Sequence, residues 1–499
     1  MMRSWTWSGL TIALLLLVAA TIRLVDIGHP VDGHLREPQR EIDAAGLVRA
    51  LQHSEVSVFF PRPDWSSEIP QSPQPLPLQA WLTASASHVL GDAERNSRVI
   101  SYVAALLGVW LFWRLARALL PIHAAEAALL LYAFSPLAIR TASLVNPAGL
   151  SLMLYLAALL AFVRWRERDS TARFVVTLVM TWLAVLVDPA AMHLLLIFIG
   201  LILVREGGAA APLKRLFVLG AGAMAVLTLW YGMQWLTHTS ATNLLNPPAD
   251  DYLIHVITQA LASVWRIGLI EVAFVWMPAG LILTWWGTRW WSRSRHFGYF
   301  AWWAAGLLLT YLISTPWSGM VGALSVHVYS LPLASLAVGL GFAAAMGSLP
   351  ASFGATTHPV KQRLALALFV ITLANQLALV FLDANSQRWS THYADARTFV
   401  AQVPPGARVA VVGEVRQDPL GVDSRGDAAY YLYWMQRAGI GLAPMRQSVD
   451  SLAGLGAGNF AFLIAERRWL ARYPLLADAL RLRYSVVVEG RRAVLFSVR

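Results

Sequence analysis

Eleven long apolar stretches, separated by short polar segments, constrain this sequence more than any other feature. A helix needs about 20 apolar residues to cross the hydrocarbon core of a bilayer. The first stretch lacks a small-residue cleavage site before Asp26 and many others follow it, so we expect an uncleaved helix there. We predict membrane-spanning helices at roughly 5–25, 98–119, 122–140, 146–164, 172–188, 190–204, 214–236, 267–288, 298–315, 327–347 and 363–383.

The overall composition excludes an ordinary soluble protein. Hydrophobic residues make up 57% of the chain and charged residues 13%, against about 25% charged residues in soluble domains. Cysteine is absent, which excludes disulfides, thiolate catalysis and cysteine-ligated metals. The net charge of +11 is compatible with nucleic acid or with a membrane. Its Lys and Arg residues gather in alternate short loops, which indicates membrane topology and no nucleic-acid partner.

The loop charges also predict an orientation. Positive residues cluster after the fourth span, at Arg164, Arg166 and Arg168, and in the other loops on that side, which should therefore be cytoplasmic. The N-terminus is then cytoplasmic, and the long polar segments 26–97 and 384–499 lie outside. We thus expect a mostly α-helical polytopic bundle at 1–383, including the outer loop 26–97, and an extracytoplasmic α/β domain at 384–499.

The first outer loop contains two predicted helices. The segment 39–53 is amphipathic, and Arg40 and Asp43 share one of its faces. A second helix is expected at 74–91 with Gly91 as its stop, and the Pro-rich stretch 59–67 between them is expected to be irregular. Two helices lying on the bilayer surface would fit. They could simply cap the bundle, or an arginine and a carboxylate could serve a polar-headed lipid.

The C-terminal segment alternates between helix and strand patterns, which favours a partly parallel sheet. The Gly-rich stretch 454–458 lacks the surroundings of a nucleotide site, so we interpret it as a loop. We expect helices at 398–403, 428–439 and 475–483, strands at 408–413 and 460–466, and a closing hairpin after 484.

Six stretches also resemble motifs of a known family. The first outer loop contains REIDAAGLVRAL (40–51), which resembles the RQADTAxIARNF signature of bacterial ArnT/PMT-like glycosyltransferases of the GT-C superfamily. These enzymes are polytopic and use sugars carried on polyprenyl phosphate. Further similar stretches follow in the family's order: FFPRPDW (59–65), PLQAWLTASASHVLG (77–91), the two spans at 98–140, HVYSLPLASLAVGLG (327–341) and YYLYWMQRAG (430–439).

The resemblance implies an inverting transfer of a sugar from a polyprenyl-phosphate donor to a lipid, glycan or protein acceptor outside a bacterial inner membrane. Asp43 matches the family's catalytic carboxylate, which would take the acceptor's proton or help to hold a divalent metal. Arg40 matches the arginine of the signature, and Arg36 and Arg49 are nearby candidates for binding the leaving phosphate.

The sequence departs from the family pattern at several charged positions. The family's second acidic residue is replaced by Ala148, with Asn146 close by. Pro75 occupies a position where the family often has Glu, and Asp188 precedes Pro189 where a Lys-Pro is common. Glu41 stands in place of the signature's Gln, and it or Glu37 could supply a second carboxylate.

Further polar residues lie near the outer ends of the predicted spans. His327 and Tyr329 either anchor the tenth span at the interface or contact the headgroup or sugar, and the motif match favours contact. Glu271 is a functional candidate because burying a carboxylate within a membrane span costs free energy. A position at the interface would remove this argument, and the same two interpretations apply to Asp188. No cluster of His residues has the spacing of a zinc site.

Three hypotheses follow. The chain is an enzyme that transfers a sugar, a non-catalytic relative that binds a lipid-linked glycan or scaffolds an envelope assembly, or a lipid or solute transporter. Asp43 favours the enzyme and Ala148 the non-catalytic relative. Paired Gly/Pro breaks in matching halves would indicate a transporter, and the sequence does not show them.

Overall fold

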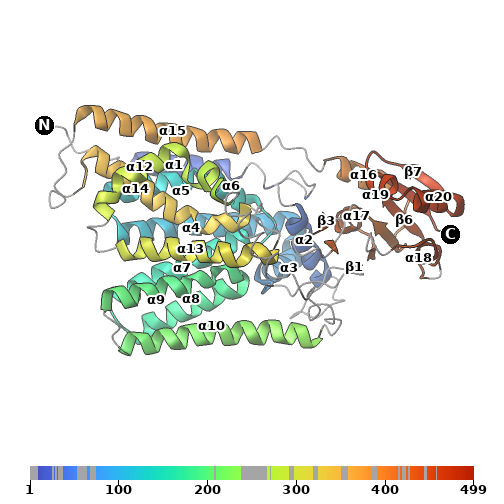
Figure 1. The fold of residues 1–499 in the computed structure, drawn as a ribbon, viewed down its shortest axis with the longest axis horizontal. Coiled ribbons are helices and arrows are strands. Elements are labelled where there is room, and N and C mark those ends of the chain that lie inside the picture. The colour runs from blue at the N-terminus through green and yellow to red at the C-terminus, as the bar shows by residue number, and fades with distance from the viewer. Residues whose placement is uncertain are drawn as a thin grey trace.

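The computed structural model combines a helix bundle with a C-terminal sheet, and α2 (Pro38–Gln52) and α3 (Leu78–Leu90) lie between them (Figure 1). We refer to the end of the bundle next to α2 and α3 as the domain-facing end. The structure describes residues 9–24, 27, 31, 38–52, 65–67, 75–206, 210–237, 267–269, 271–291, 297–318, 324–349, 358–383, 390–413, 416–417, 423–424, 428–442, 447–456 and 458–498.

Helices occupy all the positions that hydropathy predicts. Within the described ranges, five helices are long and apolar enough to cross a membrane, and two bent pairs raise the number to seven. The other predicted spans coincide with shorter apolar helices. The bundle consists of α1 (Gly9–Ile22), α4 (Ala93–Leu119), α5 (Ile122–Ala133), α6 (Pro136–Ser143), α7 (Ala148–Glu167), α8 (Thr171–Val187), η1 (Pro189–Met192), α9 (His193–Glu206), α10 (Ala210–Thr237), η3 (Glu271–Trp276), α12 (Pro278–Trp291), α13 (Phe297–Ser318), η5 (Leu324–Tyr329), α14 (Leu331–Met346) and α15 (Pro359–Asp383).

Proline accounts for both bends. Helices α5 and α6 meet at 51°, and Pro136 stands at the start of α6. The π-helical turn η3 ends before Met277, whose φ is +57°, and Pro278 opens α12. A proline disfavours the α conformation in the residue before it, so each helix stops there and restarts in a new direction. The second bend places Glu271 within a short irregular turn.

Helix α14 is the buried centre of the bundle. Its apolar window is completely buried, and two glycines allow neighbouring helices to approach closely. A Cβ on Gly339 would lie 2.6 Å from the carbonyl oxygen of Ala124 in α5. A Cβ on Gly341 would lie 1.9 Å from the carbonyl oxygen of Leu283 in α12. Since backbone atoms on both sides leave no room for a side chain, these glycines fix the spacing of α5, α14 and α12.

We predict that Gly341→Ala destabilises the protein by at least ~1–3 kcal/mol, because its methyl group would collide with backbone rather than with a flexible side chain. Gly220→Ala in α10 is the matched control, since a Cβ there meets nothing within 4 Å. Thermal unfolding in detergent should show a lower Tm for Gly341→Ala and an equal or higher Tm for Gly220→Ala. Equal Tm values for the two variants would contradict this packing.

The C-terminal domain is the predicted α/β sheet with a closing hairpin. Its strand order is β1-β5-β2-β6-β8-β7, in which β1, β5, β2 and β6 are parallel and β8 and β7 are antiparallel to their neighbours. Its elements are α16 (Ser390–Val400), β2 (Val409–Val412), β3 (Arg416–Gln417), β4 (Asp423–Ser424), α17 (Ala428–Met435), β5 (Gly439–Gly441), α18 (Val449–Ala453), β6 (Phe462–Glu466), α19 (Arg467–Arg472), α20 (Pro474–Arg483), β7 (Ser485–Glu489) and β8 (Ala493–Ser497).

The edge strand β1 (Trp65–Ser67) comes from the first loop and corrects one expectation. We expected 59–67 to be irregular, but Trp65, Ser66 and Ser67 pair in parallel with Gly439, Ile440 and Gly441 of β5. The residues 53–64 lie outside the described residues. The first loop is therefore part of the C-terminal sheet, a pairing that a single short strand does not reveal by its own pattern.

The two loop helices differ in their surroundings. Gly91 ends α3 with a φ of +82°, as expected, and Leu82, Val89 and Leu90 of α3 are exposed, which suits a helix at a membrane surface. Helix α2 instead contributes Ile42 and Ala45 to the hydrophobic core of the C-terminal domain. Leu47 and Val48, further along α2, pack on α3. Helix α2 is thus buried between two layers and does not lie on a bilayer surface.

Candidate functional site

Helix α2 is fixed to the bundle by a buried ion pair. Glu41 and Arg98 of α4 are both 1% exposed, and a carboxylate oxygen of Glu41 lies 3.5 Å from the guanidinium. The same oxygen accepts a 2.8 Å hydrogen bond from the backbone N–H of Val145. Arg98 also donates to the carbonyl of Ser143. Glu41 therefore joins α2, α4 and the segment that precedes α7.

Gln79 of α3 holds the same segment from a second side. Its amide nitrogen donates to the carbonyl of Val145 at 2.8 Å and to the hydroxyls of Ser97 and Ser101. The side chain is buried, so these bonds compensate for its desolvation. The segment 143–147 is thus placed by polar contacts from α2, α3 and α4.

Burial raises the pKa of Glu41 above its ordinary value, and the nearby Arg98 guanidinium and the Val145 N–H oppose that rise. We expect the ionised form to persist because one of its oxygens has both a cation and an N–H donor, whereas an isolated carboxylate at this depth would take up a proton. This arrangement gives Glu41 the role of a positioning residue for α2.

We predict that Arg98→Met destabilises the protein by about 3–5 kcal/mol, because it leaves the carboxylate of Glu41 buried without its cation. Combining it with Glu41→Gln should recover most of that loss, since the amide oxygen still accepts the bond from Val145. Denaturant unfolding in detergent of the two single variants and the double variant measures this coupling. Additive losses would show that the ion pair does not anchor α2.

Asp43 lies two residues beyond Glu41 and is partly buried on the same helix. It is therefore held at the domain-facing end of the bundle through the Glu41 contacts. Arg36 lies outside the described residues, and Arg40 belongs to α2 without a described side chain. The roles assigned to Asp43, Arg36 and Arg40 stay predictions.

Arg49, at the other end of α2, contacts the C-terminal domain. Its guanidinium donates to the carbonyl of Tyr433 at 3.5 Å and lies 5.8 Å from the centre of that ring. The Tyr433 hydroxyl donates to Glu94 of α4, which also accepts from the N–H of Val31 at 2.9 Å. Burial and the adjacent Glu94 raise the pKa of Tyr433, so this phenol stays a neutral donor. Arg49 is therefore part of an interdomain contact, and its predicted role in substrate binding is untested.

His327 forms a carboxylate–imidazole pair with Glu271 at the same end of the bundle. Its Nδ1 lies 2.6 Å from Oε1 of Glu271, which also accepts bonds from the hydroxyls of Tyr311 at 2.6 Å and Ser330 at 2.7 Å. Because a carboxylate oxygen only accepts, Nδ1 carries a proton, and in the neutral tautomer that this bond selects Nε2 would be an acceptor. Glu271 retains 12% exposure, and its Oε2 makes none of these bonds.

Tyr329 is bonded to Asp188. Its hydroxyl donates to Oδ2 at 2.6 Å, while Oδ1 of Asp188 accepts from the N–H of Ala190 at 3.0 Å and caps η1. The hydroxyl of Ser151 in α7 also contacts the Tyr329 hydroxyl. Asp188, which stands where the family commonly has a lysine, therefore accepts hydrogen bonds on both carboxylate oxygens, from the Ala190 N–H and from the Tyr329 hydroxyl.

The beginning of α7 brings these groups to one region. Val145 contacts Glu41 just before α7 begins, and Ser151 contacts Tyr329 in the first turn of α7. Between them, Asn146 accepts from the N–H of Ala148 through Oδ1, whereas its buried Nδ2 has no acceptor among the residues that the structure describes. Glu41 and Tyr329 thus contact residues at the beginning of α7, and the roles predicted for the site residues stay predictions.

Sequence reasoning missed the partners that hold these side chains. Arg98 was assigned to the start of a span, Gln79 lay in the stretch 77–91 without being singled out, and Ser151 and Tyr311 carried no motif. Ser151 and Tyr311 could have been found as polar residues within predicted membrane spans, where such residues often have a functional or structural partner. In the part of the chain that the structure describes, no three His, Asp or Glu side chains gather as a metal site.

Comparisons with known proteins support the fold. Residues 72–235 match the family model described as dolichyl-phosphate-mannose-protein mannosyltransferase. The structure is similar to ArnT from Cupriavidus metallidurans in the apo state, with 15% identity, 98% of each chain covered and a TM-score of 0.63. The chain shares the fold of ArnT. The predicted resemblance, the mostly helical bundle and the small C-terminal sheet are confirmed, and the chain is a multi-pass membrane protein.

Other structures share the same fold. ArnT bound to undecaprenyl phosphate matches with 14% identity, 98% of each chain covered and a TM-score of 0.57. The Archaeoglobus fulgidus oligosaccharyltransferase tethered with an acceptor peptide matches with 13% identity and a TM-score of 0.56, covering 99% of this chain and 74% of that one. No curated protein matches the sequence.

Proposed function

We propose that this ArnT-like protein transfers a sugar from a polyprenyl-phosphate carrier to an envelope lipid, glycan or protein at the outer face of a bacterial inner membrane. The observation that carries the proposal is the position of Asp43. It lies on a helix that is clamped between the domain-facing end of the bundle and the C-terminal domain. The fold, and the undecaprenyl phosphate and acceptor peptide bound by proteins that share it, support the proposal.

In this proposal Asp43 accepts the proton of the acceptor's nucleophile. The acceptor attacks the anomeric carbon, the bond from that carbon to the carrier phosphate breaks, and the configuration of the sugar inverts. Arg36 and Arg40 would stabilise the departing phosphate, since both belong to the same part of the first loop. If Asp43 instead holds a divalent cation, that cation would supply part of the positive charge.

The Glu271–His327 pair would bind the donor sugar. Nε2 of His327 can accept a hydrogen bond from a sugar hydroxyl, and Oε2 of Glu271 can accept a second one. Tyr311 and Ser330 hold the other carboxylate oxygen, so the pair does not have to reorganise when the sugar binds. Asn146 would add a donor at the position near Ala148, through its Nδ2.

Two substitutions favour a second candidate, a non-catalytic relative that binds a lipid-linked glycan. Ala148 stands in the position of the family's second acid, and Asp188 offers no positive charge to a carrier phosphate. Such a protein would still need contacts to the carrier and to the sugar, but not Asp43. The two candidates therefore differ in what removal of this one carboxylate does.

We predict that Asp43→Asn lowers transfer from a labelled polyprenyl-phosphate sugar at least ~100-fold, because the amide can no longer accept the proton. Asp478→Asn in α20 is the control, since Asp478 is exposed on the C-terminal domain. Unchanged transfer by Asp43→Asn would refute the mechanism. Binding of the carrier sugar without turnover, in the wild type as in the variant, would establish the non-catalytic candidate. Inhibition of wild-type transfer by a chelator would assign Asp43 to a metal rather than to proton transfer.

We predict that Glu271→Gln raises KM for the donor by about tenfold and changes kcat less, since a hydrogen bond to a charged group contributes ~1.5–3 kcal/mol. The matched control is Glu126→Gln, which alters another Glu–His pair, with His123 at 3.4 Å, near the beginning of α5. Steady-state kinetics in detergent with varied donor measures both variants. Equal KM values for the wild type and Glu271→Gln would remove this pair from the donor site.

A further inference from the structure

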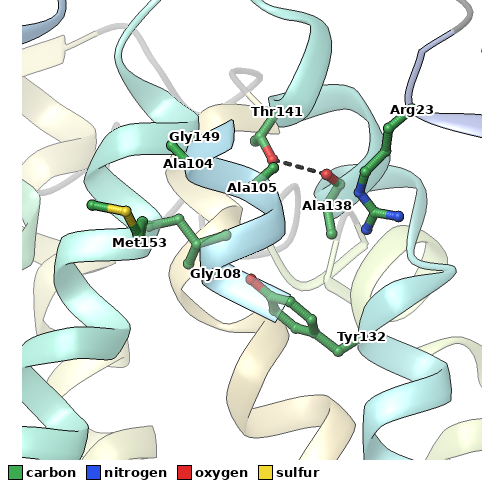
Figure 2. Close-up of a pocket in the computed structure, with 10 residues that line it drawn as sticks. Arg23, Ala104, Ala105, Gly108, Tyr132, Ala138, Thr141, Gly149 and Met153 are labelled. Atoms are coloured by element: carbon green, nitrogen blue, oxygen red, sulfur yellow. Dashed lines mark hydrogen bonds between the residues drawn. The ribbon is translucent and has the colours of Figure 1, made fainter. Parts of the chain in front are cut away.

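The hollow beside Arg23, inside the bundle, has room for about one water molecule (Figure 2). Small residues line it, among them Ala104, Ala105 and Gly108 of α4 and Gly149 of α7. It is therefore too small for a substrate or a lipid headgroup. A surface with space for a partner lies on the C-terminal domain, at α20 and β7 (Figure 1).

Helix α20 leaves one apolar side uncovered. Leu475 is 83% exposed and Leu482 is 89% exposed, and two turns of helix separate them, so they share one side of α20. Ala477 and Leu480 pack the other side into the core of the domain. A surface helix usually presents polar residues outward, so exposed leucines at this spacing indicate a contact surface.

The strand β7 adds an unpaired strand edge to this surface. It pairs with β8 on one side and ends the sheet, so no described strand pairs with its other side. Val486 and Val487 are exposed on it. Val486 lies opposite Phe496, which belongs to the same core cluster as Ala477 and Leu480 of α20. Cross-strand partners point to one face of a sheet, so Val486 lies on the face that α20 covers.

The same stretch of chain is rich in arginine. Residues 467–492 include seven arginines against two acidic residues, and one of these acids, Glu489, is already paired with Arg467 at 2.7 Å. Because α19 contacts α20 and α20 contacts β7, these charges gather at one end of the domain. Arg483 precedes β7 and Arg491 follows it, so each end of the strand has an exposed arginine. This distribution of charge favours an acidic partner.

The position and the charge of this surface narrow down its occupant. α20 and β7 lie at the end of the domain that points away from the bundle, so the bilayer around the bundle does not reach them (Figure 1). A second copy bound through the same surface would place arginines against arginines, because a two-fold contact brings identical patches together. A different protein with both apolar and acidic side chains satisfies the leucines and the arginines.

We propose that α20 and β7 form a docking face for a short extended segment of another protein, apolar at its centre and acidic at both ends. The segment pairs with the free edge of β7 as an added strand. Its apolar side chains cover Leu482 and Val486, and its acidic ends meet Arg483 and Arg491. A register shift between Val486 and Val488 bends the edge, which limits the pairing to a few residues. This docking does not depend on glycosyl transfer.

The test measures the fluorescence anisotropy of a labelled peptide, a run of valines with glutamates at each end, added to the full-length protein in detergent. The wild type should bind it, but not the same peptide with N-methylated valines, which cannot donate to a strand edge. Arg483→Glu and Arg491→Glu should each weaken binding roughly 3- to 10-fold, because an attraction between exposed charges becomes a repulsion. The control Arg397→Glu lies on α16, which packs on the opposite face of the sheet, and should keep full binding.

The apolar contact is tested separately. Leu482→Ser should weaken binding of the peptide several-fold, because it removes apolar area that the segment buries. Val89→Ser changes a similarly exposed side chain on α3 and should leave binding unchanged. Since all the substituted side chains are exposed, each variant should unfold at the Tm of the wild type.

Four results would contradict the proposal. A peptide that does not bind at about 1 mM would overturn it outright, and equal binding of the N-methylated peptide would show attraction of anions without strand pairing. A dimer of the wild type that Arg483→Glu dissociates would assign the face to a second copy. Recruitment of phosphatidylglycerol vesicles to protein in phosphatidylcholine nanodiscs, lost in the same variant, would assign it to a lipid surface.

Discussion

The ion pair between Glu41 and Arg98 determines where α2 lies, and the rest of the candidate site depends on that placement. Two charges at this depth are expensive to desolvate, and the pair persists because Val145 and Ser143 add hydrogen bonds on either side. One carboxylate thereby links the first loop, α4 and the entrance to α7. The same helix contributes Ile42 to the core of the C-terminal domain, so the ion pair also determines where that domain docks.

The polar groups at the domain-facing end are arranged in pairs, and each pair is held by hydrogen bonds from neighbouring residues. Ser330 and Tyr311 hold Glu271 for His327, and Ala190 holds Asp188 for Tyr329. Such supports keep side chains in one geometry before a ligand arrives. An acidic residue at position 188, where the family commonly has a lysine, is compatible with the fold because the Asp188 carboxylate accepts the Ala190 N–H at the start of η1.

Much of this fold follows from local patterns. Hydropathy locates the bundle helices, Gly91 marks the end of α3, and the alternation after residue 390 predicts the α/β domain. Those signals are periodic or depend on one residue's backbone preference, so a single sequence contains them. The motif match also selects Glu41 and Tyr329, which contact residues at the beginning of α7.

The rest could not be predicted because it depends on partners far away in the sequence. The bond between Glu41 and Val145 spans 104 residues, and that between Tyr433 and Glu94 spans 339. Nothing local to Arg49 indicates that Tyr433 will lie beside it. The burial of α2 depends likewise on a domain that begins more than 300 residues later, so its amphipathic pattern alone suggested a membrane surface.

The strand β1 ties the beginning of the chain to its end, which has a consequence for synthesis. Trp65 pairs with Gly439, 374 residues later (439 − 65). At ~5–20 residues per second, a ribosome needs roughly 20–75 s to make that stretch. During this time the bundle is being inserted while the first loop waits without its partner strand. The first loop, which contains Asp43, and the C-terminal sheet therefore reach their final structure together. An unfinished chain has neither the paired first loop nor the complete sheet.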